Sequence, residues 1–211
     1  MGLEWSHFLE KVLASDLNHY LWLRSISYLE YIGYRKMVKA VPYQEVEQGV
    51  FRHLSDEIQH SFMLKEMAQK TFEQIQVSQS TLDELVEISE EYFQGIDQMA
   101  NEWVSRVLGK EDRLSCYVWV SYMIEKRAMQ VYYSYLSRIV HTPLKTMIQK
   151  IIRDESEHLN YLENQIPQLP EALSPEHSPL LESEKPFFDQ FLNRMKAIFQ
   201  KVSAIPQTLS A

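Results

Sequence analysis

Apolar side chains recur every three or four residues along almost the whole of this 211-residue chain, the spacing that places them on one face of an α-helix. The stripe formed by Leu23, Ile26, Tyr34 and Met37 is one example. Glycine is scarce, with 5 residues in 211, or about 2% against a usual share of about 7%. Because strands and hairpin turns consume glycine and helices exclude it, the chain is predicted to be all-α. The low glycine content argues against all-β folds and against glycine-loop nucleotide binders.

Prolines, one glycine and one capping pattern divide this periodicity into separate helices. Pro42 is expected to end the first, and Thr81 with Glu84 has the spacing of a capping box that opens the third. Gly109 suits a left-handed residue after that helix, and Pro143 suits the first turn of the fifth. The expected helices cover about 4–39, 43–72, 81–109, 112–140 and 143–166. A proline-rich loop over 167–177 then precedes a last amphipathic helix with the stripe Phe187, Phe188, Phe191, Leu192, Met195, Ile198 and Phe199.

Helices of this length in one small domain favour a bundle with near-parallel axes. We expect a four-helix bundle made of two helical hairpins joined by a helical crossover, with an added C-terminal helix. Residues 1–170 are expected to form the bundle, and residues 171–211 to form a loop plus an amphipathic helix packed on it.

Charge and cysteine content exclude several functional classes. With 21 basic and 29 acidic residues, a net charge of −8, no phosphate-neutralising surface is expected, so nucleic acid is not a predicted partner. The single cysteine, Cys116, excludes an internal disulfide framework and a multi-cysteine zinc or iron–sulfur site. The longest apolar stretches are far shorter than the roughly 20 residues of a membrane span, and no secretory signal is visible. The expected location is cytoplasmic.

Two segments of the chain repeat one chemical motif. Residues 56–60 read Asp-Glu-Ile-Gln-His, and residues 154–158 read Asp-Glu-Ser-Glu-His. In each, the Glu and the His are three residues apart and therefore share one helix face. Apolar residues frame both motifs, so these polar side chains point where a core would form. Burying ionised carboxylates without compensation costs several kcal/mol or more, and a pair of cations would supply that compensation.

The other two long helices each hold one carboxylate in a matching position. Glu30 interrupts the stripe of the first helix, and Glu125 interrupts the corresponding stripe of the fourth. The chain therefore repeats one unit, a helix with a Glu followed by a helix with Glu-x-x-His. One Glu from each of two helices and a Glu-x-x-His from each of the others is the ligand set of di-iron and di-manganese bundles. The candidate metal ligands are Glu30, Glu57, His60, Glu125, Glu155 and His158.

Four carboxylates and two imidazoles suit a pair of iron ions, with manganese as the alternative. Asp56 and Asp154 each precede a motif glutamate and are turned about a third of the way around the helix from it. From there each is placed to accept the N–H of a ligand histidine on a facing helix, which fixes the tautomer of that imidazole.

On these residues, the chain resembles the ferritin-like di-iron carboxylate superfamily over about residues 15 to 165. The doubled motif is similar to that of members that activate O2, among them arylamine N-oxygenases, the tRNA-modifying hydroxylase, aldehyde-deformylating oxygenases and fatty acyl desaturases. The resemblance implies a ferritin-like bundle in which the six candidate ligands hold two iron ions. It also implies a non-haem di-iron oxidase or oxygenase with O2 as co-substrate, a small organic substrate and an external electron donor such as a ferredoxin. A homodimer is an assembly consistent with it.

Four further residues stand close to these ligands along the helices. His53 lies one turn before Glu57, where it is either a further metal ligand or an ordinary partly buried histidine. Arylamine N-oxygenases carry an extra histidine one turn before a Glu-x-x-His, in their second copy, where this chain has Ile151. Three tyrosines lie three or four residues from candidate ligands: Tyr34, Tyr122 and Tyr161. They are either redox-active or pocket-lining side chains, or they are aromatic packing beside the metals.

Three other functions use similar bundles. A ferritin-type ferroxidase or storage shell disagrees with the C-terminal extension and with a site that contains two histidines. A rubrerythrin-like peroxidase of full-length type would need a four-cysteine module that this chain lacks. A purely structural bundle would leave the paired motifs without a purpose. The substrate and the reaction type are not specified by the sequence.

Overall fold

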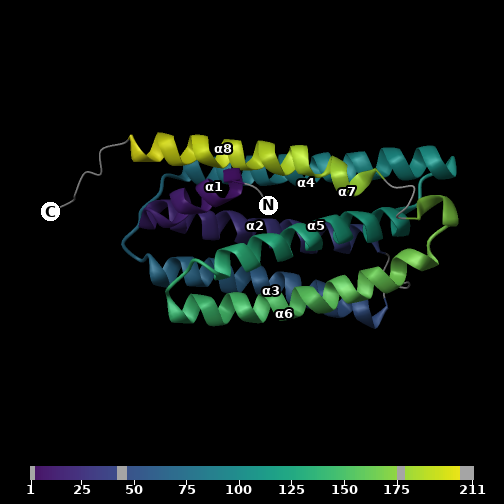
Figure 1. Cartoon of the computed structure of the whole chain (residues 1–211), viewed down its shortest axis with the longest axis horizontal. Coiled ribbons are helices and arrows are strands. Elements are labelled where there is room, and N and C mark those ends of the chain that lie inside the picture. The colour runs from purple at the N-terminus through teal and green to yellow at the C-terminus, as the bar shows by residue number, and fades with distance from the viewer. Residues whose placement is uncertain (1–2, 42–46, 175–178, 205–211) are drawn as a thin grey trace.

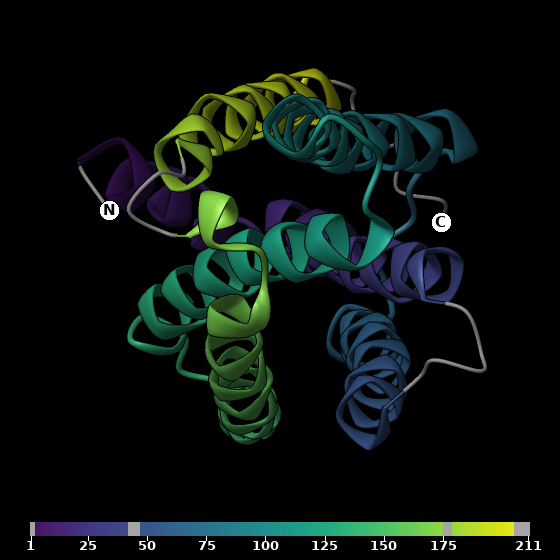
Figure 2. The same ribbon diagram turned by 90° about the vertical axis from the view of Figure 1, so that its right-hand side faces the viewer.

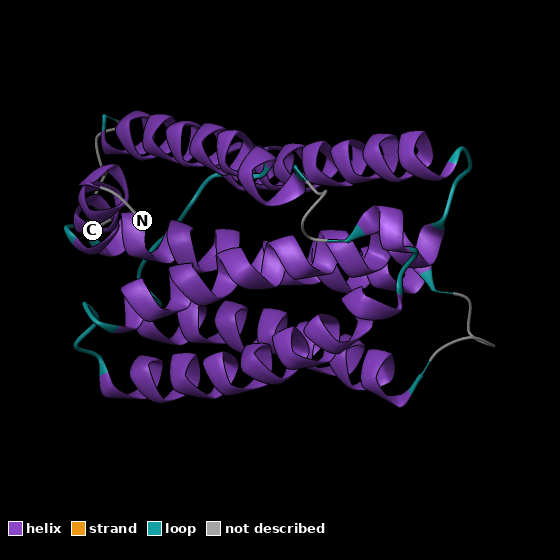
Figure 3. Ribbon diagram, turned by 45° about the vertical axis from the view of Figure 1, so that its right-hand side comes forward, coloured by secondary structure: helices purple, strands orange, loops and turns teal. Residues whose placement is uncertain are grey.

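The computed structural model describes residues 3–41, 47–174 and 179–204, and every regular element in these ranges is a helix (Figures 1 and 3). The prediction of an all-α chain is thus confirmed. The elements are α1 (Leu3–Leu13), α2 (Asp16–Ala40), α3 (Gln48–Thr71), α4 (Gln79–Leu108), α5 (Arg113–Leu136), α6 (Thr142–Gln165), the 3-10 turns η2 (Ile166–Gln168) and η3 (Glu171–Leu173), α7 (Leu180–Ser183) and α8 (Lys185–Ser203).

The long helices lie in three layers (Figures 1 and 2). The middle layer holds α2 and α5, one outer layer holds α3 and α6, and the opposite outer layer holds α4 and α8. Within this arrangement α2 packs against α3, α5 packs against α6, and each pair contacts the other, so these four helices form a bundle. The crossover helix α4 lies across α2 and α5 on the side away from α3 and α6.

The first expected helix, over 4–39, is wrong as a single element, because the chain breaks between α1 and α2. Ser15 is the N-cap of α2, and its side-chain oxygen accepts a hydrogen bond from the backbone N–H of Asn18 at 3.3 Å. The Asn18 amide in turn donates to the Lys11 carbonyl at 2.9 Å. These bonds satisfy backbone groups at a helix boundary that the apolar periodicity alone does not reveal. The short α1 folds back so that Phe8 packs edge-on against Trp22.

The capping box expected at Thr81 and Glu84 is also wrong. Helix α4 begins two residues earlier, because the Ser78 hydroxyl accepts the backbone N–H of Thr81 at 3.3 Å. Glu84 instead forms an ion pair with Lys201 of α8 at 2.8 Å. At the other end of α4, Gly109 has φ +67°, the left-handed conformation expected for it.

The remaining boundaries differ by a few residues from the expected ones. Helix α5 ends at Leu136 rather than near 140, and α6 begins at Thr142 with Pro143 in its first turn, as expected. Pro42 and Tyr43, the expected boundary of the second helix, lie outside the described residues, and α3 is described from Gln48. The expected loop over 167–177 contains two 3-10 turns in the part that is described.

The C-terminal helix α8 packs against α4 (Figure 1). Its apolar stripe is buried there, including Phe188, Phe191, Met195 and Phe199. Burial of this stripe explains why the segment is amphipathic without any need for a membrane surface. None of the described helices is long and apolar enough to cross a lipid bilayer.

Candidate metal centre

Seven side chains of metal-ligand type converge in the bundle formed by α2, α3, α5 and α6. None of them is more than 8% exposed. Within each Glu-x-x-His motif, the three-residue spacing puts both side chains on the face that the apolar stripe turns inward. The seven residues are Glu30 on α2, His53, Glu57 and His60 on α3, Glu125 on α5, and Glu155 and His158 on α6.

The seven residues form two groups that share one carboxylate. His53, Glu57, Glu125 and His158 each offer a ligand atom within 4.8 Å of the others, and so do Glu30, Glu57, His60 and Glu155. Glu57 belongs to both groups. Glu155 also reaches both, since its Oε1 lies 3.0 Å from His60 Nδ1 and its Oε2 lies 2.9 Å from His158 Nδ1. Two carboxylates thus span two adjacent positions, each of which could hold one cation.

Two buried ligand atoms at one of these positions lack hydrogen-bond partners. His60 Nδ1 and Glu155 Oε1 lie at ion-pair distance, 3.0 Å apart, and neither atom has a hydrogen-bond partner among the described residues. Buried polar atoms are nearly always hydrogen-bonded, so two such atoms facing each other require an explanation. A cation bound by both would supply it, and the set of carboxylate and imidazole donors suits iron or manganese.

The imidazoles of this cluster are surrounded by negative charge. Burial lowers the pKa of His60, but the carboxylates of Glu155 and Glu30 outweigh burial and raise this pKa to about 12. Burial also lowers the pKa of His158, but Glu125 and Glu155 outweigh burial and raise this pKa to about 11. Protons on these rings compensate the carboxylates when no metal is bound, and a bound cation replaces such protons.

The carboxylates respond to the same environment in opposite directions. Burial, with Glu30 and Glu155 nearby, raises the pKa of Glu57 well above its usual range. Burial also acts to raise the pKa of Glu125, but hydrogen bonds from His158 and His53 hold this pKa well below its usual range. The metal-free protein therefore tolerates the charge of Glu57, the shared carboxylate, less well than that of Glu125.

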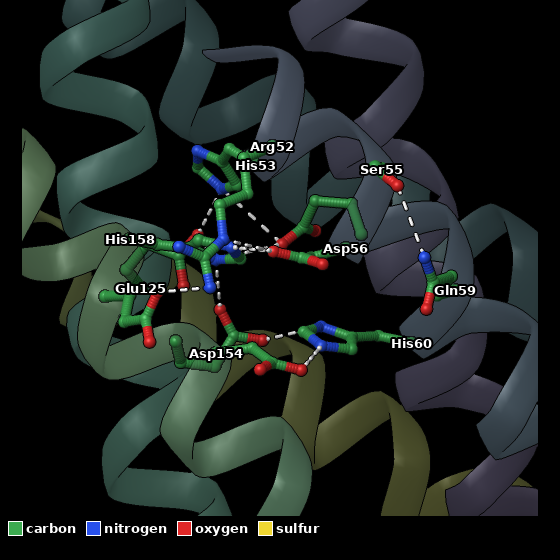
Figure 4. Close-up of polar contacts among 12 residues, drawn as sticks. Arg52, His53, Ser55, Asp56, Gln59, His60, Glu125, Asp154 and His158 are labelled. Atoms are coloured by element: carbon green, nitrogen blue, oxygen red, sulfur yellow. Dashed lines mark hydrogen bonds and ion pairs between the residues drawn. The ribbon is translucent and has the colours of Figure 1, made fainter. Parts of the chain in front are cut away.

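Asp56 and Asp154 face the outer nitrogens of the two motif histidines (Figure 4). His60 Nε2 lies 3.1 Å from Asp154 Oδ2, and His158 Nε2 lies 3.2 Å from Asp56 Oδ2. Each aspartate is on the helix facing its histidine, as the sequence predicts. If each Nε2–H donates to its aspartate, each Nδ1 presents a lone pair to the cluster.

His53 belongs to the group that contains Glu125 and His158 of the second hairpin, although it lies next to the first motif in sequence. Its Nε2 is 2.6 Å from Glu125 Oε1 and 3.5 Å from Glu57 Oε1, and its ring stacks on His158 with centroids 4.0 Å apart. Burial lowers its pKa, but Glu125 and Glu57 outweigh burial and raise the pKa to about 9. Of the two readings that the sequence leaves open, this placement favours a ligand, because α3 and α5 bring His53 and Glu125 together.

The three tyrosines singled out in the sequence have other surroundings. Tyr122 is buried, with its hydroxyl accepting a hydrogen bond from Lys126 at 3.2 Å, and Tyr161 donates to Glu47 at 3.2 Å. Tyr34 is half-buried on α2. No hydrogen bond joins any of the three to a cluster residue within the described ranges.

Two tyrosines that the sequence reading does not single out contact the cluster. The Tyr132 hydroxyl donates to Glu30, and the Tyr117 hydroxyl lies 3.4 Å from His53 Nδ1. Tyr132 lies seven residues after Glu125, two turns along the same face, which is the signal that could have identified it. Gly33 is another residue next to the cluster that the sequence does not single out. A Cβ at this position would lie 2.8 Å from Glu57 Oε2.

Two cavities meet this cluster. The larger, of about 240 Å³, is lined by His53, Glu57 and Glu125 at the cluster. The smaller, of about 50 Å³, touches Glu30, Glu57 and Glu125 and has a mainly apolar wall. The cluster is therefore accessible to small molecules from one side, although its own atoms are buried.

No protein-family model, curated protein or solved structure matches this chain. A helical bundle supports many unrelated functions, so the function of this chain depends on the chemistry of its site.

Proposed function

We propose that this protein is a ferritin-like non-haem di-iron oxidase or oxygenase that uses O2 to oxidise a small organic molecule. One observation carries the proposal: seven buried ligand-type residues form two groups that share Glu57, directly beside a cavity of about 240 Å³. Iron, with manganese as the alternative, is the metal that this mixture of carboxylates and imidazoles suits. Bound iron would supply the redox chemistry with O2, which amino acid side chains lack.

The protein residues would hold the metals in defined positions. Glu57 and Glu155 would connect the two positions, with Glu30 and His60 on one side and Glu125, His158 and His53 on the other. The aspartates would fix which imidazole nitrogen is left to bind a metal, since each is placed to accept an outer N–H. Tyr132 donates to Glu30 and thereby fixes the orientation of that carboxylate.

The larger cavity favours a reaction on an organic substrate over iron storage. Met37, Phe93, Val120 and Ile124 contribute apolar surface to it. A cavity whose inner wall is largely apolar and ends at the candidate ligands can position a carbon compound beside them. Such a reaction also needs electrons, for which we propose an external donor such as a ferredoxin.

The test is anaerobic loading with Fe(II), followed by exposure to O2 and counting of the bound iron. We expect two irons per chain, one for each ligand group, and rapid O2 consumption without further iron uptake. Glu155→Gln should lose most of this iron, because Glu155 reaches both groups. Glu163→Gln, on the exposed face of the same helix, is the matched control and should load normally.

Other results would contradict the proposal in distinct ways. Iron accumulation far beyond two per chain, with a growing ferric product, would indicate ferroxidase or storage activity. A correctly folded chain that binds no transition metal stoichiometrically would exclude the di-iron site altogether.

A further inference from the structure

The larger cavity has a buried floor and an exposed, charged rim. Its floor is formed by His53, Glu57 and Glu125, all nearly inaccessible to solvent. Its rim includes Lys39 and Arg113, both of which are exposed. The cavity therefore connects the candidate metal ligands with the protein surface.

Cations dominate the charged side chains that line this cavity outside the cluster. They are Lys36, Lys39 and Arg113, and Asp97 is the single acidic residue among them. Asp97 pairs with Lys36 at 2.6 Å, whereas Lys39 and Arg113 form no ion pair with any described residue. Among the rim side chains of this lining, cations therefore outnumber acids by three to one, the reverse of the balance in a chain with a net charge of −8. Such an entrance attracts anions.

The fold does not require these two cations. Arg113 is the first residue of α5, and a positive charge there opposes the helix dipole. The neighbouring Asp112 already caps this helix, since its carboxylate accepts the Ser115 N–H at 3.1 Å. Lys39 lies in the last turn of α2, where a cation contributes only weakly. Removing both charges should therefore leave the bundle folded.

The cavity walls and volume set the kind of molecule that fits. Met37 and Phe93 are buried apolar residues of the lining, with Val120 and Ile124 beside them. The volume of about 240 Å³ exceeds that of an engineered cavity of about 150 Å³ known to bind benzene. A substituted ring or a short alkyl chain would therefore fit, with room for one polar head.

We propose that the substrate of this site is a small organic acid, held with its carboxylate at Lys39 and Arg113 and its apolar body directed toward the cluster. This inference rests on the proposed function for the statement that the bound molecule is the substrate. The binding site itself depends only on the cavity and its cations. Orientation follows from the charges, because the floor holds the carboxylate of Glu125, whereas the rim holds Lys39 and Arg113, which form no ion pair with a described residue.

The test is a binding titration with two matched pairs of probes, benzoate against benzamide and hexanoate against hexanamide. It is run by calorimetry on the full chain, metal-free and loaded with redox-inactive Zn(II). We expect each carboxylate to bind at least about tenfold more tightly than its amide, as charged hydrogen bonds are the stronger ones. Equal binding of acid and amide, or no binding of either, would overturn the proposal.

Variants at the rim separate this site from direct binding to the metals. Lys39→Gln with Arg113→Gln should weaken benzoate binding about tenfold, whereas Lys39→Arg with Arg113→Lys should retain most of it. Lys65→Gln, an exposed lysine in a different groove, should change affinity less than about twofold. Unchanged benzoate affinity in the folded double Gln variant would also overturn the proposal, since the acid would then bind elsewhere.

The zinc count distinguishes this inference from the proposed function. Two zinc ions per chain without selectivity for acids would leave the metal centre standing and remove the anion site. Selective binding of acids by a chain that binds no zinc would support the anion site and remove the oxygenase.

Discussion

Gly33 is the residue at which helix stability and metal binding are opposed. It lies inside α2, where alanine is preferred by about 1 kcal/mol. A Cβ there would lie 2.8 Å from Glu57 Oε2, the end of a flexible side chain that can move away. The glycine therefore leaves room for the carboxylate shared by both ligand groups.

We expect Gly33→Ala to stabilise the metal-free protein by about 0.5–1 kcal/mol and to weaken metal binding about tenfold or more. Urea unfolding of the metal-free chain and a Zn(II) titration measure the two effects. Gly95→Ala is the control with the opposite pattern, because its Cβ would meet the Phe187 ring of α8 at 2.5 Å rather than a candidate ligand. It should lower stability and leave metal affinity unchanged. Normal metal affinity in Gly33→Ala would show that Glu57 does not need this space.

His19 makes the stability of the bundle sensitive to mild acid. Burial, reinforced by His141 and opposed by Asp16, lowers its pKa to about 4, against about 6.5 in an unfolded chain. Between these values the unfolded state binds the extra proton, so this contribution to stability is complete above about pH 6.5 and is lost as the pH falls toward 4. Its ring nitrogen contacts the Tyr135 hydroxyl, and the ring packs on Phe72.

The comparison that isolates this effect is urea unfolding of the native chain and His19→Gln from pH 7.5 to 4.5. We expect the native chain to lose about 1–2 kcal/mol more than the variant over this range, an amount reduced because the ring is partly exposed. Parallel pH profiles of the native chain and the variant would mean that His19 has the same pKa in the folded and the unfolded state.

At the scale of elements, the C-terminal segment is attached to the bundle by a partly buried ion pair. The Arg127 guanidinium of α5 contacts both carboxylate oxygens of Glu184, with Nε at 3.0 Å from Oε1 and 3.2 Å from Oε2. Tyr92 of α4 donates to the same carboxylate at 2.6 Å. Glu184 is 3% exposed and lies at the junction of α7 and α8, while Phe188 of α8 lies beneath the guanidinium. The carboxylate of Glu184 thus links α4 and α5 to the start of α8.

Glu184→Gln should lower the free energy of unfolding by about 2 kcal/mol, because it removes the charged partner of Arg127; this is less than for a fully buried pair, since Arg127 is partly exposed. Urea unfolding followed by circular dichroism measures this loss. Arg194→Gln breaks the exposed ion pair between α8 and Glu91 and should cost no more than about 1 kcal/mol. Similar losses in both variants would mean that burial adds nothing to the Arg127–Glu184 pair.

The elements also show what the sequence can and cannot specify. Helix type follows from the apolar spacing, and the meeting of Glu57 with His60 on one face follows from a three-residue interval, because both depend on local geometry. The break at Ser15 and the cap at Ser78 were missed because single hydrogen bonds, rather than periodicity, decide them.

Contacts across helices are the part that periodicity does not specify. His53 is local to Glu57 in sequence, yet its shortest contact is with Glu125 of another helix. Tyr132 reaches Glu30, and the rim cations meet at one cavity, only because of how α2 and α5 pack. Such placements depend on helix offset and rotation, which a pattern of apolar residues leaves undetermined.

For the whole molecule, the proposed metals would act as crosslinks, because their ligands come from all four helices of the bundle. A ligand that binds only the folded state stabilises it, by about 2.7 kcal/mol at a free concentration 100 times its Kd. For a chain of this size, that gain corresponds to a rise in Tm of about 5–10 °C.

We expect Zn(II) to produce this rise and a chelator to reverse it without loss of helicity. Glu155→Gln should abolish most of the rise, while Glu163→Gln should preserve it. A Tm that does not respond to metal in a well-folded chain would show that the four helices are held by their apolar core alone.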